Sequence, residues 1–335
     1  SHRLSHDGLN LKVVDISDIY DEFGWGRSDA LAIRYFLKYA FLNWSSPKPS
    51  SCTFMGDGHF DYMGYIGTGG GNFIPPFENL SPGVFRSWGS DDNYVFFGRD
   101  GYYDSDNSDF PDMVTGRIPV KSNSQLETVI DKIINYDLNS DINQWKNLIT
   151  IIADDQYGDD LNKDTNEWFH TSQAEALSNE HIPGSFHRNK IYLTAYPMEP
   201  GRIKPLVNEQ IINSFNEGTL IVDFIGHGNK NTWTHEHVFT KAGDLPKIKN
   251  RRNLAMVLAA SCSIGFWDDI GDEGMSEDFL RLSANGAIAV ISATRAVFAG
   301  PNTDLNNKIF DIMLSTDSLS TAEALFLAKL ERQQN

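Results

Sequence analysis

A cysteine and a histidine are the residues in this sequence whose side chains could together carry out nucleophilic catalysis. Cys262 follows the apolar run Leu-Ala-Met-Val-Leu-Ala-Ala-Ser, and His227 follows Thr-Leu-Ile-Val-Asp-Phe-Ile-Gly. A thiol is mostly protonated at neutral pH, and a nearby imidazole can accept its proton or stabilise the thiolate. The imidazole can then return a proton to a leaving amine. The pair predicts peptidase chemistry, with Cys262 as nucleophile and His227 as acid/base partner.

The elements that must position this pair are apolar strands alternating with amphipathic helices. Several strand-like runs are apolar throughout, which is typical of parallel strands covered on both faces. We expect strands at 12–16, 52–55, 94–97, 148–153, 190–194, 219–225, 254–260 and 287–292. We expect helices after Ser124, where Glu127 completes a capping box, over 204–216, and from a second box at Ser320 and Glu323. Alternation of this kind predicts a doubly wound α/β fold.

The polar stretch at 137–143 is the expected seam between an N-terminal α/β half, 1–140, and a C-terminal catalytic half, 141–335. In open α/β sheets, chemistry collects at the carboxyl ends of the strands. Only 34 residues, 228–261, separate His227 from Cys262, so their strands are expected to be neighbours. The N–H groups of Gly228 and Cys262 could then form an oxyanion hole, because a glycine lets substrate approach the backbone.

Composition limits the class of partner. The 335 residues carry a formal net charge of -17, which makes a nucleic-acid partner unlikely on electrostatic grounds, and suits a protein that collects calcium or works outside the cell. No apolar run reaches the ~18 residues that would span a membrane. Cys52 reads as a small buried hydrophobe. The polar start and the helical pattern running into Asn335 suggest a domain cut from a longer protein.

Several ordered motifs resemble the gingipain family of cysteine peptidases. They are Gly-His-Gly-Asn-Lys-Asn-Thr-Trp from Gly226, Ala-Ala-Ser-Cys-Ser-Ile-Gly-Phe-Trp-Asp-Asp from Ala259, and Ser-Ala-Asn-Gly-Ala-Ile-Ala-Val-Ile-Ser-Ala-Thr-Arg ending at Arg295. Upstream, Phe54-Met-Gly-Asp-Gly-His-Phe-Asp-Tyr, Val114-Thr-Gly-Arg-Ile-Pro-Val and Ala153-Asp-Asp extend the similarity over nearly the whole chain. The branch that it resembles most includes the signal peptidase, or sortase, of type IX secretion.

The resemblance implies a caspase-like three-layer sandwich, with mostly parallel sheets in two packed subdomains. It also implies a dyad of Cys262 and His227, a protein or peptide substrate, and export to the surface or surroundings of a bacterium. The chemistry would need no cofactor. Contact with the outer-membrane secretion machinery would depend on flanking domains. After the nucleophile, Ser-Ile-Gly-Phe-Trp-Asp-Asp is less acidic than the sortase pattern, so a general gingipain-type endopeptidase is the expected activity.

Aspartates supply further candidates. Asp154 and Asp155 end a strongly apolar run. Either carboxylate could orient His227 as a third catalytic group, and we assign this role to Asp155. Alternatively, both could bind a cation together with Asp159 and Asp160. Asp104 and Asp106 belong to a stretch of alternating oxygen ligands that calcium loops use, although the glycine and glutamate of an EF-hand are missing. A solvated acidic turn is the alternative there.

The last hypotheses concern a substrate pocket and two alternative functions. Trp233 and Arg295 could line a substrate pocket, or Trp233 could lie in the core and Arg295 could pair with a carboxylate. His227, His235 and His237 with Glu236 could instead bind a metal in a metallohydrolase, although their spacing matches no strong zinc pattern. The other alternative is a non-catalytic binding module in which Cys262 is inert.

Overall fold

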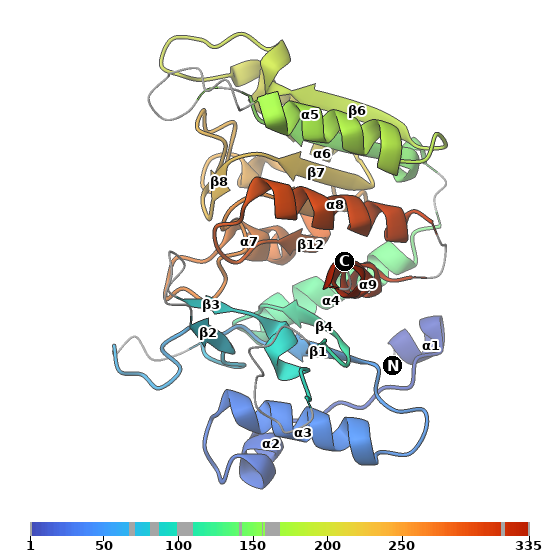
Figure 1. The fold of residues 1–335 in the computed structure, drawn as a ribbon, viewed down its shortest axis with the longest axis vertical. Helices are drawn as coiled ribbons and strands as arrows, with labels where there is room; N and C mark the ends of the chain where they lie inside the picture. The colour runs from blue at the N-terminus through green and yellow to red at the C-terminus, as the bar shows by residue number, and fades with distance from the viewer. Residues whose placement is uncertain are drawn as a thin grey trace. The chain divides into compact units, whose positions relative to one another are not determined.

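The computed structural model describes residues 2–66, 71–80, 87–98, 110–140, 143–155, 157, 168–315 and 319–333. Contacts divide the chain into two units (Figure 1). The first unit comprises 1–80 and 89–121, and the second comprises 81–88 and 122–335. Each unit has its own core. No helix in the described ranges combines the length and apolar character needed to cross a bilayer.

A five-stranded parallel sheet organises the second unit. In spatial order its strands are β12 (Ala287–Ser292), β11 (Ala255–Ala260), β7 (Ile221–Ile225), β5 (Leu148–Ala153) and β6 (His187–Tyr192). The chain passes from β5 outward to β6 and then returns to the other side of β5 as β7. The carboxyl ends of β5 and β7 therefore flank the point at which the strand order reverses, where open α/β sheets bind ligands.

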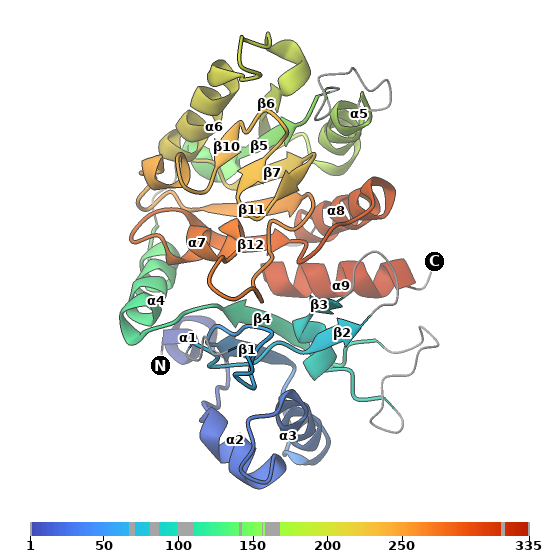
Figure 2. The same ribbon diagram turned by 90° about the vertical axis from the view of Figure 1, so that its left-hand side faces the viewer.

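Helices cover both faces of this sheet, so the unit is a three-layer sandwich. Figure 2 shows α6 (Pro205–Glu217) and α7 (Met275–Arg281) on one side, and α5 (Trp168–Ala176) and α8 (Ala299–Met313) on the other. Side chains of β5 alternate between the two cores, because Ile152 packs with the α6 and α7 side whereas Ile149 and Ile151 pack with the α5 and α8 side. The expected caspase-like α/β sandwich is confirmed.

The remaining elements of the second unit are short, except for two helices. These are α4 (Asn123–Asp137), α9 (Thr321–Gln333), the π-helical turn Leu177–His181, the 3-10 turns Gln144–Asn147, Leu193–Ala195 and Leu245–Lys247, and the strands β8 (Gly228–Asn229), β9 (Thr232–Trp233) and β10 (Phe239–Thr240). Strands β8, β9 and β10 form a small antiparallel sheet directly after His227.

The first unit has a smaller core around two parallel strands, β1 (Ser51–Met55) and β4 (Val114–Ile118). Its other elements are α1 (His2–Asp7), α2 (Ile16–Phe23), α3 (Ala30–Asn43), β2 (Glu78–Leu80) and the 3-10 turn Asp91–Tyr94, while β3 (Ser87–Gly89) crosses the division. Arg117 ties this unit together. Its guanidinium binds both carboxylate oxygens of Asp91, at 2.7 and 2.9 Å, and donates to the carbonyls of Gly56 and Ile74.

The observed division between the units lies at 121/122, not at the expected 140/141. The reason is that α4 packs with the second unit. Lys132, buried in the middle of this helix, donates through Nζ to the carbonyl oxygens of Phe279 and Leu280 at 3.3 and 2.8 Å, near the end of α7. The polar seam at 137–143 follows this helix, so it lies inside the second unit rather than between the two.

Candidate active site

His227 and Cys262 follow two adjacent strands at matched positions. In the register of β7 and β11, Ile225 lies opposite Ala260, and His227 and Cys262 each come two residues later. Both residues therefore leave the sheet at its carboxyl edge, from neighbouring strands. The expectation that one edge of the sheet carries both residues is confirmed. Both strands are buried along their whole length, which fixes the backbone from which the two loops start.

Gly228 brings the two loops into close contact. A Cβ atom at this position would lie 2.6 Å from Ser261 Oγ and 2.9 Å from Ile264 Cδ1, so any other residue would displace these side chains. Glycine lets the backbone beside His227 pack directly against two side chains of the Cys262 loop. The loop is closed on its other side by a hydrogen bond from Thr234 N to the carbonyl oxygen of His227, at 2.8 Å.

The thiol of Cys262 is half-buried and lies against the backbone of Val297. The N–H of Val297 donates to Sγ at 3.4 Å, and Sγ lies 3.6 Å from the Val297 carbonyl oxygen. The following residue, Ser263, has a left-handed φ of 54° and donates its N–H to the carbonyl oxygen of Arg295 at 3.0 Å. This N–H is therefore occupied.

Side chains from three places in the described part of the chain contact His227. Asp154, at the end of β5, accepts the His227 N–H through Oδ2 at 2.8 Å. His170 of α5 and His235 lie beside the imidazole, with ring centroids 5.2 Å and 4.7 Å away. Gly226 permits the first contact, because a Cβ there would be 2.5 Å from Asp154 Cβ. The acid/base candidate is thus held by its own backbone and flanked by two further imidazoles.

A group of buried carboxylates lies behind this loop. Asp154, Asp155 and Glu236 are all at most 2% exposed, and one oxygen from each lies within 4.8 Å of the others. Asp155 pairs with the buried ammonium group of Lys204 and accepts the N–H of Tyr157 at 2.9 Å. Burial raises the pKa of Asp154 well above its usual range. Burial also raises the pKa of Glu236, and the negative charge of Asp155 raises it further. The Asp154 carboxylate contacts His227 at the main-chain N–H of the histidine. A role for Asp155 in orienting the imidazole stays a prediction.

A family model described as peptidase family C25 matches residues 1–335. The chain belongs to peptidase family C25. The expected resemblance to the gingipain family is confirmed, and this C25 chain is a cysteine peptidase. Its membership decides against the two alternative classes, the metallohydrolase and the inert binding module. No protein with curated function matched the C25 chain in a sequence search.

Solved structures share the fold of the C25 peptidase. The complex of the pro- and mature domains of RgpB from Porphyromonas gingivalis superimposes with a TM-score of 0.68, at 19% identity over 99% of this chain and 70% of that one. The Arg-specific cysteine proteinase gingipain R, RGPB, gives 0.66 at 19% identity over 98% and 71%. A third structure, of a protease, gives 0.64 at 16% identity over 92% and 64%. These likenesses establish the fold of the C25 peptidase; the narrower type IX branch stays a prediction.

Trp233 and Arg295, expected in a substrate pocket, have structural partners in the C25 peptidase. Trp233 is fully buried and stacks on Phe224, with ring centroids 4.6 Å apart, so the predicted substrate contact is wrong. Arg295 binds both carboxylate oxygens of the buried Asp268 at 2.7 Å and lies over the ring of Phe266. This pair braces the loop after Cys262, in agreement with the alternative expectation that Arg295 meets a carboxylate.

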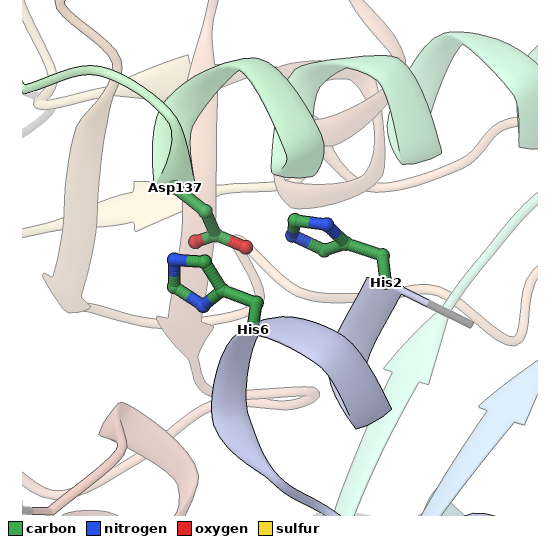
Figure 3. A group of neighbouring side chains, drawn as sticks. All are labelled: His2, His6 and Asp137. Atoms are coloured by element: carbon green, nitrogen blue, oxygen red, sulfur yellow. The ribbon is translucent and has the colours of Figure 1, made fainter.

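The predicted metal ligands of the C25 peptidase are brought together only in part. Asp104, Asp106, Asp159 and Asp160 lie outside the described residues. Within the described ranges, the groups of possible ligands with atoms in mutual reach do not combine His227, His235 and His237. Figure 3 shows the stacked rings of His2 and His6, with centroids 5.2 Å apart. Asp137, also labelled in that figure, belongs to the other unit, so we build no site from these three residues.

Some residues of this site carried no signal in the sequence. His170 lies 57 positions before His227 and follows no motif, and the main chain of Val297 could not be paired with Cys262 from spacing. Both contacts arise because α5 and the segment before α8 return to the same edge of the sheet. Gly228 and Asp154 did stand out, as a glycine beside the histidine and a carboxylate at a strand end.

Proposed function

We propose that Cys262 is the nucleophile and His227 the acid/base of a cysteine endopeptidase that cleaves protein or peptide substrates. The observation that carries this proposal is the matched register of β7 and β11, which sends both residues from adjacent strand ends to one edge. The close approach of Gly228 to Ser261 supports it, because these residues are the immediate neighbours of the dyad.

The reaction proceeds through a thioester. The thiolate sulfur of Cys262 attacks the carbonyl carbon of the scissile peptide, and the negative charge passes to the carbonyl oxygen. The C–N bond then breaks as His227 gives its proton to the leaving amine. In the second step His227 accepts a proton from water, whose oxygen attacks the thioester and releases the acid. The thiolate and the imidazolium are thereby restored.

The oxyanion would be bound by backbone N–H groups of Gly228 and Cys262. Each such donor is worth ~3 to 4 kcal/mol in hydrolases where one has been removed. Ser263 cannot serve, because its N–H already donates to Arg295. These donors are main-chain groups, and we propose that the chemistry uses no cofactor.

The test compares the reactivity of the two cysteines. Burial raises the pKa of the Cys52 thiol to about 12, so this residue should remain unreactive toward iodoacetamide at pH 6. We expect rapid alkylation of Cys262 alone, read by peptide mass spectrometry, and a loss of this selectivity in His227→Ala. His187→Ala, which removes an exposed histidine of the same unit, is the matched control. Equal labelling of both cysteines, or unchanged labelling in His227→Ala, would refute the dyad.

We also propose that the structural calcium expected from the sequence binds at Asp154, Asp155 and Glu236. Three buried carboxylates face two cations, the ammonium group of Lys204 and the guanidinium of Arg202, whose Nε forms an ion pair with Glu236 at 3.9 Å, so one negative charge is left over. Oxygen ligands and residual negative charge suit a hard divalent cation. Calcium should raise Tm relative to EGTA in the wild type and not in Glu236→Gln. Identical Tm values with calcium and with EGTA in the wild type would contradict this assignment.

The site of action is proposed on the same basis. Membership of family C25 and the net charge of -17 favour a peptidase that works at the surface of a bacterium or after secretion. Contact with the type IX secretion machinery through flanking domains is the narrower proposal. Immunodetection of the full-length protein in culture medium, membrane and cytoplasmic fractions tests both, and a purely cytoplasmic protein would contradict them.

A further inference from the structure

The imidazole of His227 is in contact with a buried imidazole from a different element. His170 of α5 is 8% exposed, and its ring stands at 88° to that of His227, with centroids 5.2 Å apart. This edge-to-face geometry is the one preferred by neighbouring rings. His235, from the segment between β9 and β10, lies on the same imidazole at 47°. His227 is therefore flanked from two separate elements.

His170 is itself held in place. Its Nδ1 lies 3.3 Å from Gln173 Oε1, one turn later in α5. The next residue, Thr171, donates its hydroxyl to the carbonyl oxygen of Asp154 at 3.2 Å. Since Asp154 also accepts the His227 N–H, α5 and the His227 loop share one anchor. The ring of His170 and the backbone of His227 are thus fixed relative to the same residue.

The ring of His170 is neutral near neutral pH. Burial, together with the neighbouring His227, lowers the pKa of His170 to about 4. Within the part of the chain that the structure describes, the ionisable groups in contact with His227 include His170 from α5, His235, and Asp154 at its main-chain N–H. A neutral neighbour can pack against His227 in both of its protonation states, so the contact persists while His227 takes up and releases a proton.

We propose that His170 is a positioning residue that holds the imidazole plane of His227 in the orientation needed for proton transfer with Cys262. This inference rests on the proposed dyad. Rotation about the last side-chain bond of histidine is broad unless neighbours restrict it. A misplacement of the order of 1 Å at a reacting group costs up to ~100-fold in rate. Loss of the His170 ring should therefore lower kcat while substrate binding is retained.

The experiment compares His170→Ala with His170→Phe, which keeps a ring but cannot titrate. His181→Ala is the matched control, because it removes a histidine that is ion-paired at the surface of the same unit. The readouts are turnover of fluorescently labelled casein and the pH profile of the iodoacetamide rate at Cys262. We expect His170→Ala to lose about 10-fold or more in kcat with KM changed less than about twofold. His170→Phe should keep kcat within about threefold, with an unshifted pH profile.

Rescue by free imidazole distinguishes loss of the His170 ring from poor folding of His170→Ala. Free imidazole can fill the space left in His170→Ala, so its addition should raise the alkylation rate of this variant and not that of His181→Ala. Wild-type kcat in His170→Ala, or an equal loss in the Ala and Phe variants without rescue by imidazole, would overturn the inference. His227→Ala separates the two levels. If it leaves alkylation of Cys262 unchanged, the dyad itself fails and this inference fails with it. If it slows alkylation and His170→Ala does not, only the positioning role is refuted.

Discussion

Replacing Gly228 by alanine should separate the two loops of the proposed dyad. The new methyl group would lie 2.6 Å from Ser261 Oγ, and ordinary contact begins at 3.4 Å, so the two atoms must separate by about 0.8 Å. Rotation of the Ser261 and Ile264 side chains takes up part of this separation, and the loops must move apart by the remainder. The N–H of residue 228 is retained, and any loss therefore reports displacement. A loop shift approaching 0.8 Å predicts a fall of up to about 100-fold in kcat/KM, equivalent to about 2.7 kcal/mol in transition-state stabilisation.

The assay is hydrolysis of labelled casein, combined with the rate of alkylation of Cys262. Gly184→Ala is the control, since no atom lies within 4 Å of a Cβ at that position. The double variant Gly228→Ala with Ser261→Gly removes the closest clash and should regain part of the lost activity. Wild-type activity in Gly228→Ala, with an intact fold, would refute the reasoning that these two loops are in tight contact.

Two further predictions concern buried charges of the second unit. Burial raises the pKa of Asp223 to about 7, although Asn306 donates to both carboxylate oxygens. The stability associated with its protonated form is complete below the ordinary value near 3.8 and is lost as pH rises through about 7, on the order of 4 kcal/mol in total. Urea unfolding at several pH values should show this loss in the wild type and a loss smaller by about this amount in Asp223→Asn; a loss of equal size in the variant would contradict it. Arg295→Lys keeps the positive charge but loses one of the two hydrogen bonds to Asp268, so it should lower the free energy of unfolding by about 1.5 to 3 kcal/mol, with KM for casein unchanged. A raised KM at unchanged stability would instead favour substrate binding by Arg295.

The central sheet could be predicted well from the sequence because its strands are apolar on both faces. The expected ranges 148–153 and 287–292 coincide with β5 and β12, and 254–260 differs from β11 by one residue. The capping box at Ser320 also formed, since Ser320 N donates to Glu323 Oε2 and Glu323 N to Ser320 Oγ. Long apolar runs and reciprocal caps are local signals that tertiary contacts rarely override.

The expected secondary structure is wrong where local hydrogen bonds to the backbone set the conformation of a short segment. The run 94–97 was expected to be a strand, but Val95 N donates to the Asp92 carbonyl, and the Asp112 carboxylate accepts the N–H of Phe97. The run 12–16 ends in a helix, because the Asp15 carboxylate accepts Ser17 N and caps α2. The expected cap at Ser124 is instead Ser122, which accepts Gln125 N. Short aromatic or β-branched runs do not determine these local choices.

The sequence allowed prediction of those residues of the candidate site that directly follow strands. Cys262, His227 and Asp154 could be located because each comes directly after an apolar run. His170 could not, since its relation to His227 depends on how α5 packs on the sheet. For Trp233 the sequence left a pocket and a core position open, because an aromatic residue near a catalytic motif has the same sequence pattern in both places.

The matched placement of His227 and Cys262 has a consequence for local unfolding. Strands β7 and β11 are central in the sheet and fully buried, so their amide hydrogens should exchange with solvent only when the whole unit opens. Fluctuations of the surface loops leave the starting points of both catalytic loops where they are. The distance between thiol and imidazole is therefore tied to the most protected part of the molecule, and catalytic competence should persist until the second unit unfolds cooperatively.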